Sequence, residues 1–221
     1  MKPLCLLDLD GTIINSKEGI INAATHAANA IGITTSNYKG NPESLIGPPM
    51  REVMRQIHPF TDAQIEEIIK HYHEYYSQKG IYENNIYPGI QDLLINLHNK
   101  GIVLAIATSN AEIYATKIAA NHNIAQYFTV IMGADTARTR EKKSEVITAA
   151  LSHLGGKSSF NSIIMIGDRE YDIIGAQQTS IKSIGITWGY GTKEELQTAG
   201  AKHIADTTQE LYNTILQQIT S

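Results

Sequence analysis

Three short apolar runs stand out along the chain, at residues 4–7, 103–107 and 163–166, and polar residues follow soon after each of them. Continuous runs of this length are typical of strands buried on both faces, as in a parallel sheet covered by helices. Such sheets bind ligands beyond the carboxyl ends of their strands. The pattern therefore predicts a site assembled from three distant segments of the chain.

Helical spacing of apolar residues fills most of the stretch between the first run and the second. It predicts a helix that ends at Gly32, a short helix after the break at residues 47–49, and a longer helix that ends at Gly80. The longer helix is expected to begin with a capping box formed by Thr61 and Gln64. This stretch is interpreted as an all-helical insertion.

From Pro88 onward, predicted helices and strands alternate. Helices are expected at about residues 90–99, 111–121, 142–154, 170–178 and from 207, and strands at about 102–108, 128–133, 162–167 and 182–187. This alternation predicts a doubly wound, mostly parallel α/β sheet with right-handed crossovers.

Aspartates follow the first and the third apolar run. Asp8 and Asp10 lie two positions apart at a strand end, so their side chains are expected to point to the same side. Asp168 and Asp172 follow the third run. Carboxylates that lie close together repel each other unless a cation lies between them, so the pattern predicts a metal site.

Composition narrows the range of partners. The formal net charge is −4, so no basic face favours nucleic acid, and no apolar stretch approaches the length of a membrane span. Cys5 is the only cysteine, so no internal disulfide is expected and an oxidising compartment is not indicated. We expect a cytoplasmic protein with neither nucleic acid nor membrane as partner. The sequence does not indicate the oligomeric state.

The histidines predict no metal site. His71 and His73 are two residues apart on a predicted helix and point to different faces. Neither a His-Glu-x-x-His nor a Cys-x-x-Cys spacing occurs, so a structural zinc site is not expected.

Four motifs occur in order along the chain: Asp8-Leu9-Asp10-Gly11-Thr12, Thr108-Ser109-Asn110, a lysine within residues 140–144, and Gly167-Asp168 followed by Asp172. Together they resemble the haloacid dehalogenase superfamily, in its phosphoglycolate-phosphatase-like branch. The resemblance implies a Rossmann-like α/β core of residues 1–15 and 86–221 and a helical cap of residues 16–85. In that family the cap closes over the active site.

The resemblance also implies the reaction, which is magnesium-dependent hydrolysis of a small phosphorylated metabolite. Asp8 would attack phosphorus and form an aspartyl phosphate, and Asp10 would protonate the leaving group and then activate water. Thr108 and the backbone amide of Ser109 would bind phosphate oxygens, and Lys143 would neutralise charge on the transferring group.

Magnesium prefers hard oxygen ligands. By the same resemblance, its protein ligands would be Asp8, the backbone carbonyl of Asp10 and Asp168. Asp172 would bond to metal-bound waters or orient the site, or it would serve as the acidic residue at a helix N-terminus.

Other assignments also leave an alternative open. Lys142 competes with its neighbour Lys143 for the catalytic position, and Thr108 could be an ordinary helix N-cap. Arg51 resembles a cap residue that contacts the substrate, or it is a solvated charge. The turn at residues 188–192 either lines the site or is a packed surface turn.

Two other functions remain as alternatives. A phosphomutase of the same superfamily uses the same aspartates and differs in how its cap excludes water. A receiver-type phosphorylation switch is not an enzyme, although it also joins an acidic pair, a hydroxyl and a lysine on a parallel sheet. Such a receiver is shorter and lacks the helical insertion, which argues against it.

Overall fold

The structure is a computed structural model that describes residues 1–32, 46–48, 50–57, 60–135 and 139–220. Its strands are β1 (Lys2–Leu7), β2 (Ile14–Asn15), β3 (Asn85–Ile86), β4 (Val103–Ala111), β5 (Val130–Ala134), β6 (Phe160–Gly167), β7 (Lys182–Ile186) and β8 (Ile204–Ala205). Its helices are α1 (Lys17–Ala30), α2 (Met50–Ile57), α3 (Asp62–Tyr76), α4 (Ile90–Asn99), α5 (Glu112–Asn121), α6 (Lys143–His153), α7 (Glu170–Gln178), α8 (Lys193–Thr198) and α9 (Thr208–Thr220). Short 3-10 helices are η3 (Gly80–Tyr82), η4 (Ala125–Tyr127) and η5 (Lys157–Ser159).

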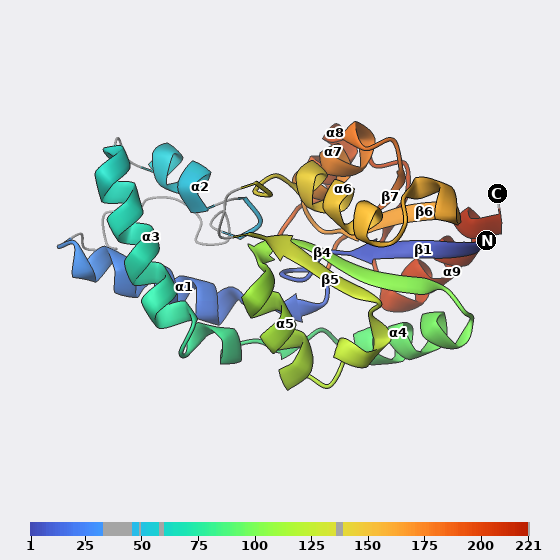
Figure 1. Ribbon diagram of the computed structural model, residues 1–221, viewed down its shortest axis with the longest axis horizontal. Coiled ribbons are helices and arrows are strands. Elements are labelled where there is room, and N and C mark those ends of the chain that lie inside the picture. The colour runs from blue at the N-terminus through green and yellow to red at the C-terminus, as the bar shows by residue number, and fades with distance from the viewer. Residues whose placement is uncertain (33–45, 49, 58–59, 136–138, 221) are drawn as a thin grey trace.

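Six strands form one sheet in the order β5-β4-β1-β6-β7-β8, with β1 between β4 and β6 (Figure 1). Every strand pairing in this sheet is parallel, so the carboxyl ends of the six strands lie along one edge. The chain builds outward from β1 first on one side and then on the other. This confirms the predicted doubly wound, Rossmann-like sheet.

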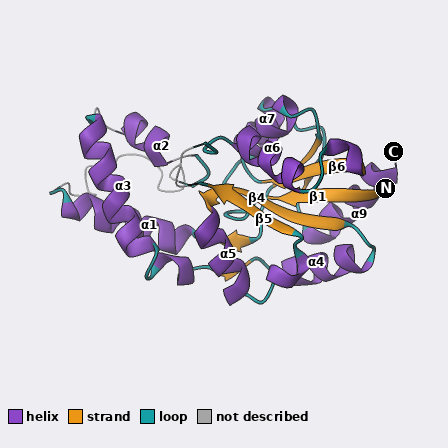
Figure 2. Ribbon diagram, viewed as in Figure 1, coloured by secondary structure: helices purple, strands orange, loops and turns teal. Residues whose placement is uncertain are grey.

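Helices cover both faces of the sheet (Figure 2). Side chains alternate along β1, so Leu4 and Leu6 pack in the core beneath α6 and α7. Cys5 and Leu7 point the other way, into the core shared with α4, α5 and α9. Burial on both faces explains why the strand is a continuous apolar run.

Helices α1, α2 and α3 lie together at the end of the molecule away from the two termini (Figure 1). The predicted capping box is present at the start of α3. The Thr61 hydroxyl accepts a hydrogen bond from the backbone N–H of Gln64 at 3.3 Å, and Gln64 Oε1 accepts one from the backbone N–H of Thr61 at 2.9 Å. The helix ends at Tyr76 rather than at Gly80, where η3 begins instead.

The segments that lead into and out of these helices pair with each other. Ile14 of β2 pairs with Ile86 of β3, and the pairing is antiparallel. A Cβ atom on Gly19 would lie 2.3 Å from the carbonyl oxygen of Gly80, so the start of α1 packs directly on η3. The sequence did not predict this pair of strands, because two-residue strands are too short to show an alternation of apolar and polar residues.

Two regions differ from the predicted elements. Strand β4 runs on to Ala111, so Thr108 lies within the strand and is not a helix cap. Helix α8 and strand β8 were not predicted, since they span only six and two residues. Among the described residues, no helix is both long enough and apolar enough to cross a membrane.

Candidate active site

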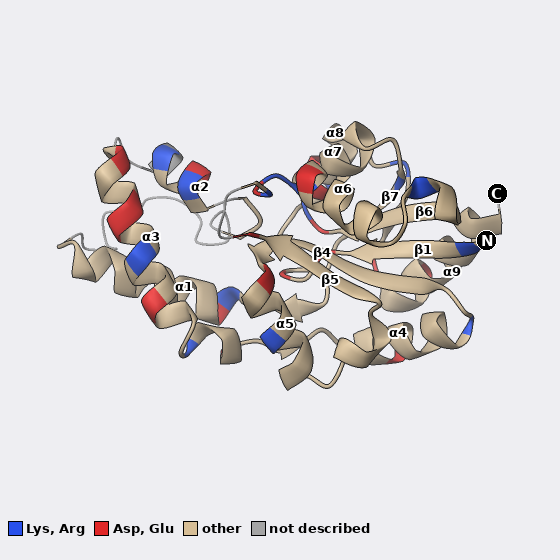
Figure 3. Cartoon of the chain, in the orientation of Figure 1, with Lys and Arg blue, Asp and Glu red and all other residues tan. Residues whose placement is uncertain are grey.

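Apart from Arg51, the predicted site residues gather at the carboxyl ends of β1, β4 and β6. Strands β4, β5 and β6 carry no charged residue along their length (Figure 3). Asp8 and Asp168 directly follow β1 and β6, and Asp172 lies in the first turn of α7. The buried members of the set are Asp8, Asp10, Thr108, Lys143, Asp168 and Asp172. Ser109 is half-buried beside them.

Lys143 stands between two of these carboxylates. Its Nζ atom lies 2.8 Å from Asp8 Oδ1 and 2.9 Å from Asp172 Oδ1, and it donates to the carbonyl oxygen of Ala107 at 3.0 Å. Lys143 is the first residue of α6, and its side chain is buried, whereas Lys142 is exposed. The structure therefore brings Lys143, and not Lys142, to the aspartates.

Three carboxylates form a cluster that could hold a metal ion. One oxygen from each of Asp8, Asp168 and Asp172 lies within 4.8 Å of the other two, and all three residues are buried. Lys143 supplies one positive charge against three negative ones. An all-oxygen donor set with excess negative charge suits a hard divalent cation.

Asp168 is held on several sides. Its Oδ1 accepts a hydrogen bond from the Thr12 hydroxyl at 3.1 Å, and its Oδ2 accepts one from the Tyr190 amide at 2.8 Å. A Cβ atom on Gly11 or Gly189 would lie 2.2 or 2.4 Å from the Asp168 carboxylate. The turn after β7 thus lines the site. The sequence signal for it was the pair of glycines around Tyr190 at a strand end.

Burial and mutual repulsion shift the pKa values in this cluster. Burial, with added repulsion from Asp172 and Asp8, raises the pKa of Asp168 to about 8. Burial also raises the pKa of Asp172 to about 6, although Lys143 opposes the shift. Burial alone would lower the pKa of Lys143, but the charges of Asp172 and Asp8 outweigh it and raise that pKa. The metal-free cluster therefore tends to take up a proton, and a bound cation would displace it.

Asp10 lies outside this cluster and has its own environment. Its Oδ2 accepts a hydrogen bond from Asn110 Nδ2 at 2.9 Å, and Asn110 also donates to the Tyr76 hydroxyl of α3 at 3.0 Å. Burial first, and then the charge of Asp8, raises the pKa of Asp10 to about 6. Side-chain hydrogen bonds with Ser16 and Asn110 oppose this shift. Neither the Asn110 contact nor Tyr76 was predicted.

A cleft opens beside Asp8 and Asp10. From the sheet it is lined by the end of β4, and from the helical segment by Ile20, Gly47, Pro48, Met50, Tyr72 and His73. Tyr72 stacks on Tyr76 with ring centroids 5.3 Å apart. Anything bound at the aspartates therefore meets an aromatic and aliphatic wall on the far side.

Arg51 does not line this cleft. It is in α2, and its guanidinium forms an ion pair with Glu66 of α3. Its contact with a substrate stays a prediction. Arg169, which was not predicted as a site residue, contacts both the helical segment and the core. It donates a hydrogen bond to the carbonyl oxygen of Ile46 and forms an ion pair with Glu195 of α8 at 2.7 Å.

Residues 5–186 match the family described as haloacid dehalogenase-like hydrolase. The chain therefore belongs to this family and is a hydrolase of its phosphatase class.

Individual relatives narrow the comparison. A 5'-nucleotidase of Pseudomonas aeruginosa is 33% identical over 201 residues, which are 91% of this chain and 90% of that protein. Tyrosine-protein kinase PtkA of Mycobacterium tuberculosis is 38% identical over 189 residues, which are 85% of this chain and 63% of that protein. A phosphoglycolate phosphatase of Vibrio cholerae is 26% identical over 220 residues, 96% of each chain. The crystal structure of a predicted phosphatase from Clostridium acetobutylicum has a TM-score of 0.90 at 35% identity, and covers 98% of this chain and 99% of that chain. The chain thus falls in the phosphoglycolate-phosphatase-like branch.

The buried ion pairs of Lys143 predict a stability difference between two adjacent lysines. Lys143→Met should lower the free energy of unfolding by about 3–5 kcal/mol, because it leaves buried carboxylates without their counter-charge. Lys142→Met should change it by less than about 0.5 kcal/mol, because that side chain is exposed. Urea unfolding at pH 8 with a chelator present measures both. Similar values for the two variants would contradict the ion-pair geometry.

Proposed function

We propose that this chain is a magnesium-dependent phosphatase that hydrolyses a small phosphomonoester through an aspartyl phosphate on Asp8. One observation carries the proposal: the Nζ atom of Lys143 bridges Asp8 and Asp172 beside a third buried carboxylate, at the end of the central strand. In this proposal the nucleophile Asp8, the positive charge of Lys143 and the metal ligands lie side by side at the end of β1.

Asp8 is the proposed nucleophile. Lys143 holds one of its carboxylate oxygens at 2.8 Å, which restricts rotation of the carboxylate and leaves the other oxygen for attack. A bond forms between that oxygen and phosphorus while the bond from phosphorus to the leaving oxygen breaks. Lys143 offsets the negative charge that spreads over the phosphoryl oxygens in the transition state.

Asp10 is the proposed proton shuttle. With a pKa raised to about 6, it is partly protonated near neutral pH and can give a proton to the leaving oxygen. The resulting carboxylate then accepts a proton from the water that attacks the aspartyl phosphate. Asn110 donates a hydrogen bond to its Oδ2, so Oδ1 would be the oxygen that exchanges the proton.

Thr108 and Ser109 are the proposed phosphate contacts. The Thr108 hydroxyl oxygen accepts a hydrogen bond from the backbone N–H of Asn110 at 3.1 Å, so the hydroxyl hydrogen of Thr108 remains to be donated. Both residues line the cleft beside Asp8. They would bind the oxygens that the Lys143 ammonium does not reach.

Asp8, Asp168 and Asp172 would hold the magnesium ion, together with the backbone carbonyl of Asp10. When bound, Mg²⁺ neutralises charge on the nucleophile and on the phosphate. Thr12 and Tyr190 keep the Asp168 carboxylate aimed at the cluster.

The proposal assigns residues 16–85 to a cap and residues 1–15 and 86–221 to the core. Pairing of β2 with β3 supports this division, since it joins the two connections of the helical segment. The substrate would be a small phosphorylated metabolite, and the cap would contact its leaving group. A cytoplasmic location is part of the proposal, supported by the single buried cysteine, Cys5.

Replacement of the nucleophile provides the direct test. Asp8→Asn should lower the turnover of phosphomonoesters by at least about 10³-fold, because the amide has similar size but is a poor nucleophile. Asp92→Asn, at an exposed position on α4, is the matched control and should keep full activity. Release of inorganic phosphate is measured alongside isomerisation of a sugar phosphate, which a phosphomutase would catalyse. Near-normal phosphate release by Asp8→Asn would exclude the covalent mechanism.

Metal dependence should be linked to pH. Without metal, the folded-state pKa values of Asp168 and Asp172 are raised to about 8 and about 6. The contribution of these two groups to stability is therefore greatest in acid and falls as the pH rises through these values. Magnesium binds the ionised carboxylates, so the rise in Tm that it causes should be larger at pH 8 than at pH 6. Chelation should abolish activity, and Mg²⁺ should restore it. A magnesium effect on Tm that was absent, or larger at pH 6, would contradict the ligand assignment.

Substrate preference should depend on the cap. His73→Ala removes a residue that lines the cleft, and Arg51→Ala removes the predicted substrate contact. Either variant should change the ranking of phosphomonoesters by kcat/KM and affect a small generic ester less, because these residues lie beyond the phosphate. Arg55→Ala, which among the described residues breaks the exposed ion pair with Asp62, is the control. An equal loss on every substrate would argue against a role in specificity.

A further inference from the structure

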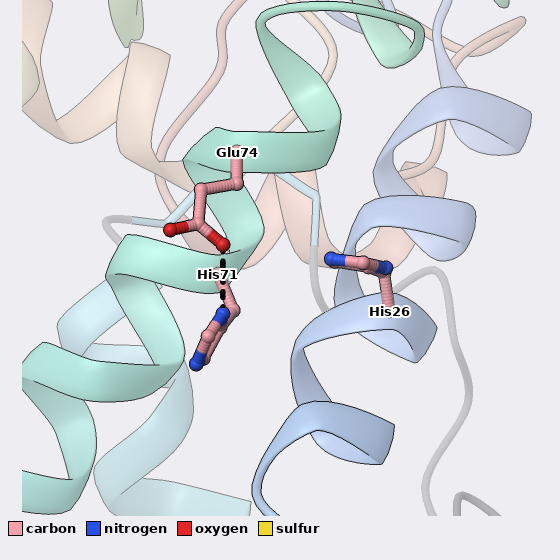
Figure 4. Close-up of side chains that lie close together, drawn as sticks. All are labelled: His26, His71 and Glu74. Atoms are coloured by element: carbon pink, nitrogen blue, oxygen red, sulfur yellow. Dashed lines mark hydrogen bonds and ion pairs between the residues drawn. The ribbon is translucent and has the colours of Figure 1, made fainter.

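A second group of metal-ligating side chains lies away from the aspartates, where α1 and α3 face each other (Figure 4). His26 comes from α1, and His71 and Glu74 come from α3. One ligand atom from each of the three lies within 4.8 Å of the other two. Helices that are distant in sequence thus bring two imidazoles and a carboxylate together.

The packing of the two helices accounts for this arrangement. His71 and Glu74 are three residues apart and share one face of α3. Ala23 and Ala27 are buried in α1, and side chains this small allow the helices to approach closely. His26 precedes Ala27 and meets His71 edge to face, with ring centroids 6.5 Å apart and an interplanar angle of 71°.

We propose that His26, His71 and Glu74 form a binding site for a transition-metal dication such as Zn²⁺, which joins α1 to α3. Two imidazoles and one carboxylate are a donor set that zinc uses in proteins, with a water molecule as the fourth ligand. The active-site cluster, in contrast, offers only carboxylate oxygens. The two clusters therefore differ in the cations that they select.

The hydrogen bond within the group marks the position of the ion. His71 Nδ1 and Glu74 Oε2 are 2.8 Å apart, so the two atoms already converge on one proton. A dication that replaces this proton would bind both atoms. His26 forms no hydrogen bond with any residue that the structure describes, and its ring nitrogens can complete the site.

The geometry needs only a small adjustment. Ligand atoms of a tetrahedral zinc site lie about 3.4 Å apart, since the bonds to nitrogen and oxygen are about 2.0–2.2 Å long. The longest separation here is no more than 4.8 Å. His26 and Glu74 are exposed and His71 is half-buried, so rotation of side chains can close the difference.

This site is separate from the catalytic cleft although it shares helices with it. Ile20 of α1 and His73 of α3 line the cleft, while His71 lies on another face of α3. A bound ion would therefore stabilise the contact between α1 and α3 without touching the aspartates. The proposal does not depend on the proposed phosphatase reaction.

Calorimetric titration with Zn²⁺ tests the site, with Mg²⁺ in large excess to occupy the aspartate cluster. The wild-type chain should bind one Zn²⁺. His26→Ala and His71→Ala should each weaken this binding at least about tenfold, because each loses a direct ligand. His153→Ala, at an exposed histidine of α6, should bind like the wild type. Saturating Zn²⁺ should raise the Tm of the wild type and of His153→Ala, but not that of the other two variants.

Several outcomes would overturn the proposal. They are a wild-type chain that binds no Zn²⁺ in the presence of Mg²⁺, equal affinity for the wild type and both ligand variants, or an equal loss in His153→Ala. Circular dichroism of His26→Ala and His71→Ala separates a lost ligand from a lost fold. Glu74→Gln provides a second variant that keeps the size of the side chain, and it should also weaken binding.

Discussion

The rest of the structure depends on the burial of several carboxylates around one lysine. Asp8, Asp168 and Asp172 are buried side by side, and Lys143 forms ion pairs with Asp8 and Asp172. Burial of like charges is unfavourable, and the raised pKa values of Asp168 and Asp172 are its direct expression. A fold that keeps such a group needs rigid support from every side and an affinity for cations, and both requirements shape the surrounding elements.

The sheet order provides that support. Because β1 lies between β4 and β6, the ends of all three strands converge, and α6 begins where its first side chain reaches the aspartates. The Thr12 hydroxyl and Asp168, 156 positions apart in sequence, form a hydrogen bond across this junction. Gly189 lies so close to the Asp168 carboxylate that any side chain there would displace it. Most of the chain must therefore be folded before the site exists.

The sequence predicts the parts that depend on local patterns. Apolar runs give the central strands, helical spacing gives the helices, and the capping residues at Thr61 give the start of α3. Contacts set by tertiary packing are not predicted from the sequence. Tyr76 reaches Asn110 because the end of α3 lies beside the end of β4. Arg51 forms an ion pair with Glu66 and does not line the cleft. The proximity of His26 to His71 is not predicted either, because residue spacing within one helix does not show how that helix is aligned with a neighbouring helix.

Asn110 links the two halves of the proposed mechanism. Its amide donates both to Asp10, the proposed proton shuttle, and to Tyr76 of the helix that lines the other side of the cleft. Burial is the largest cause of the raised pKa of Asp10. Tyr72 and His73 of α3 line the same cleft as Asp10. If α3 moved away from the sheet, water would reach Asp10, its pKa would fall toward the usual range, and it would lose the proton that the leaving group needs. In the proposed mechanism, acid catalysis at Asp10 therefore depends on the helical segment that lines the other side of the cleft.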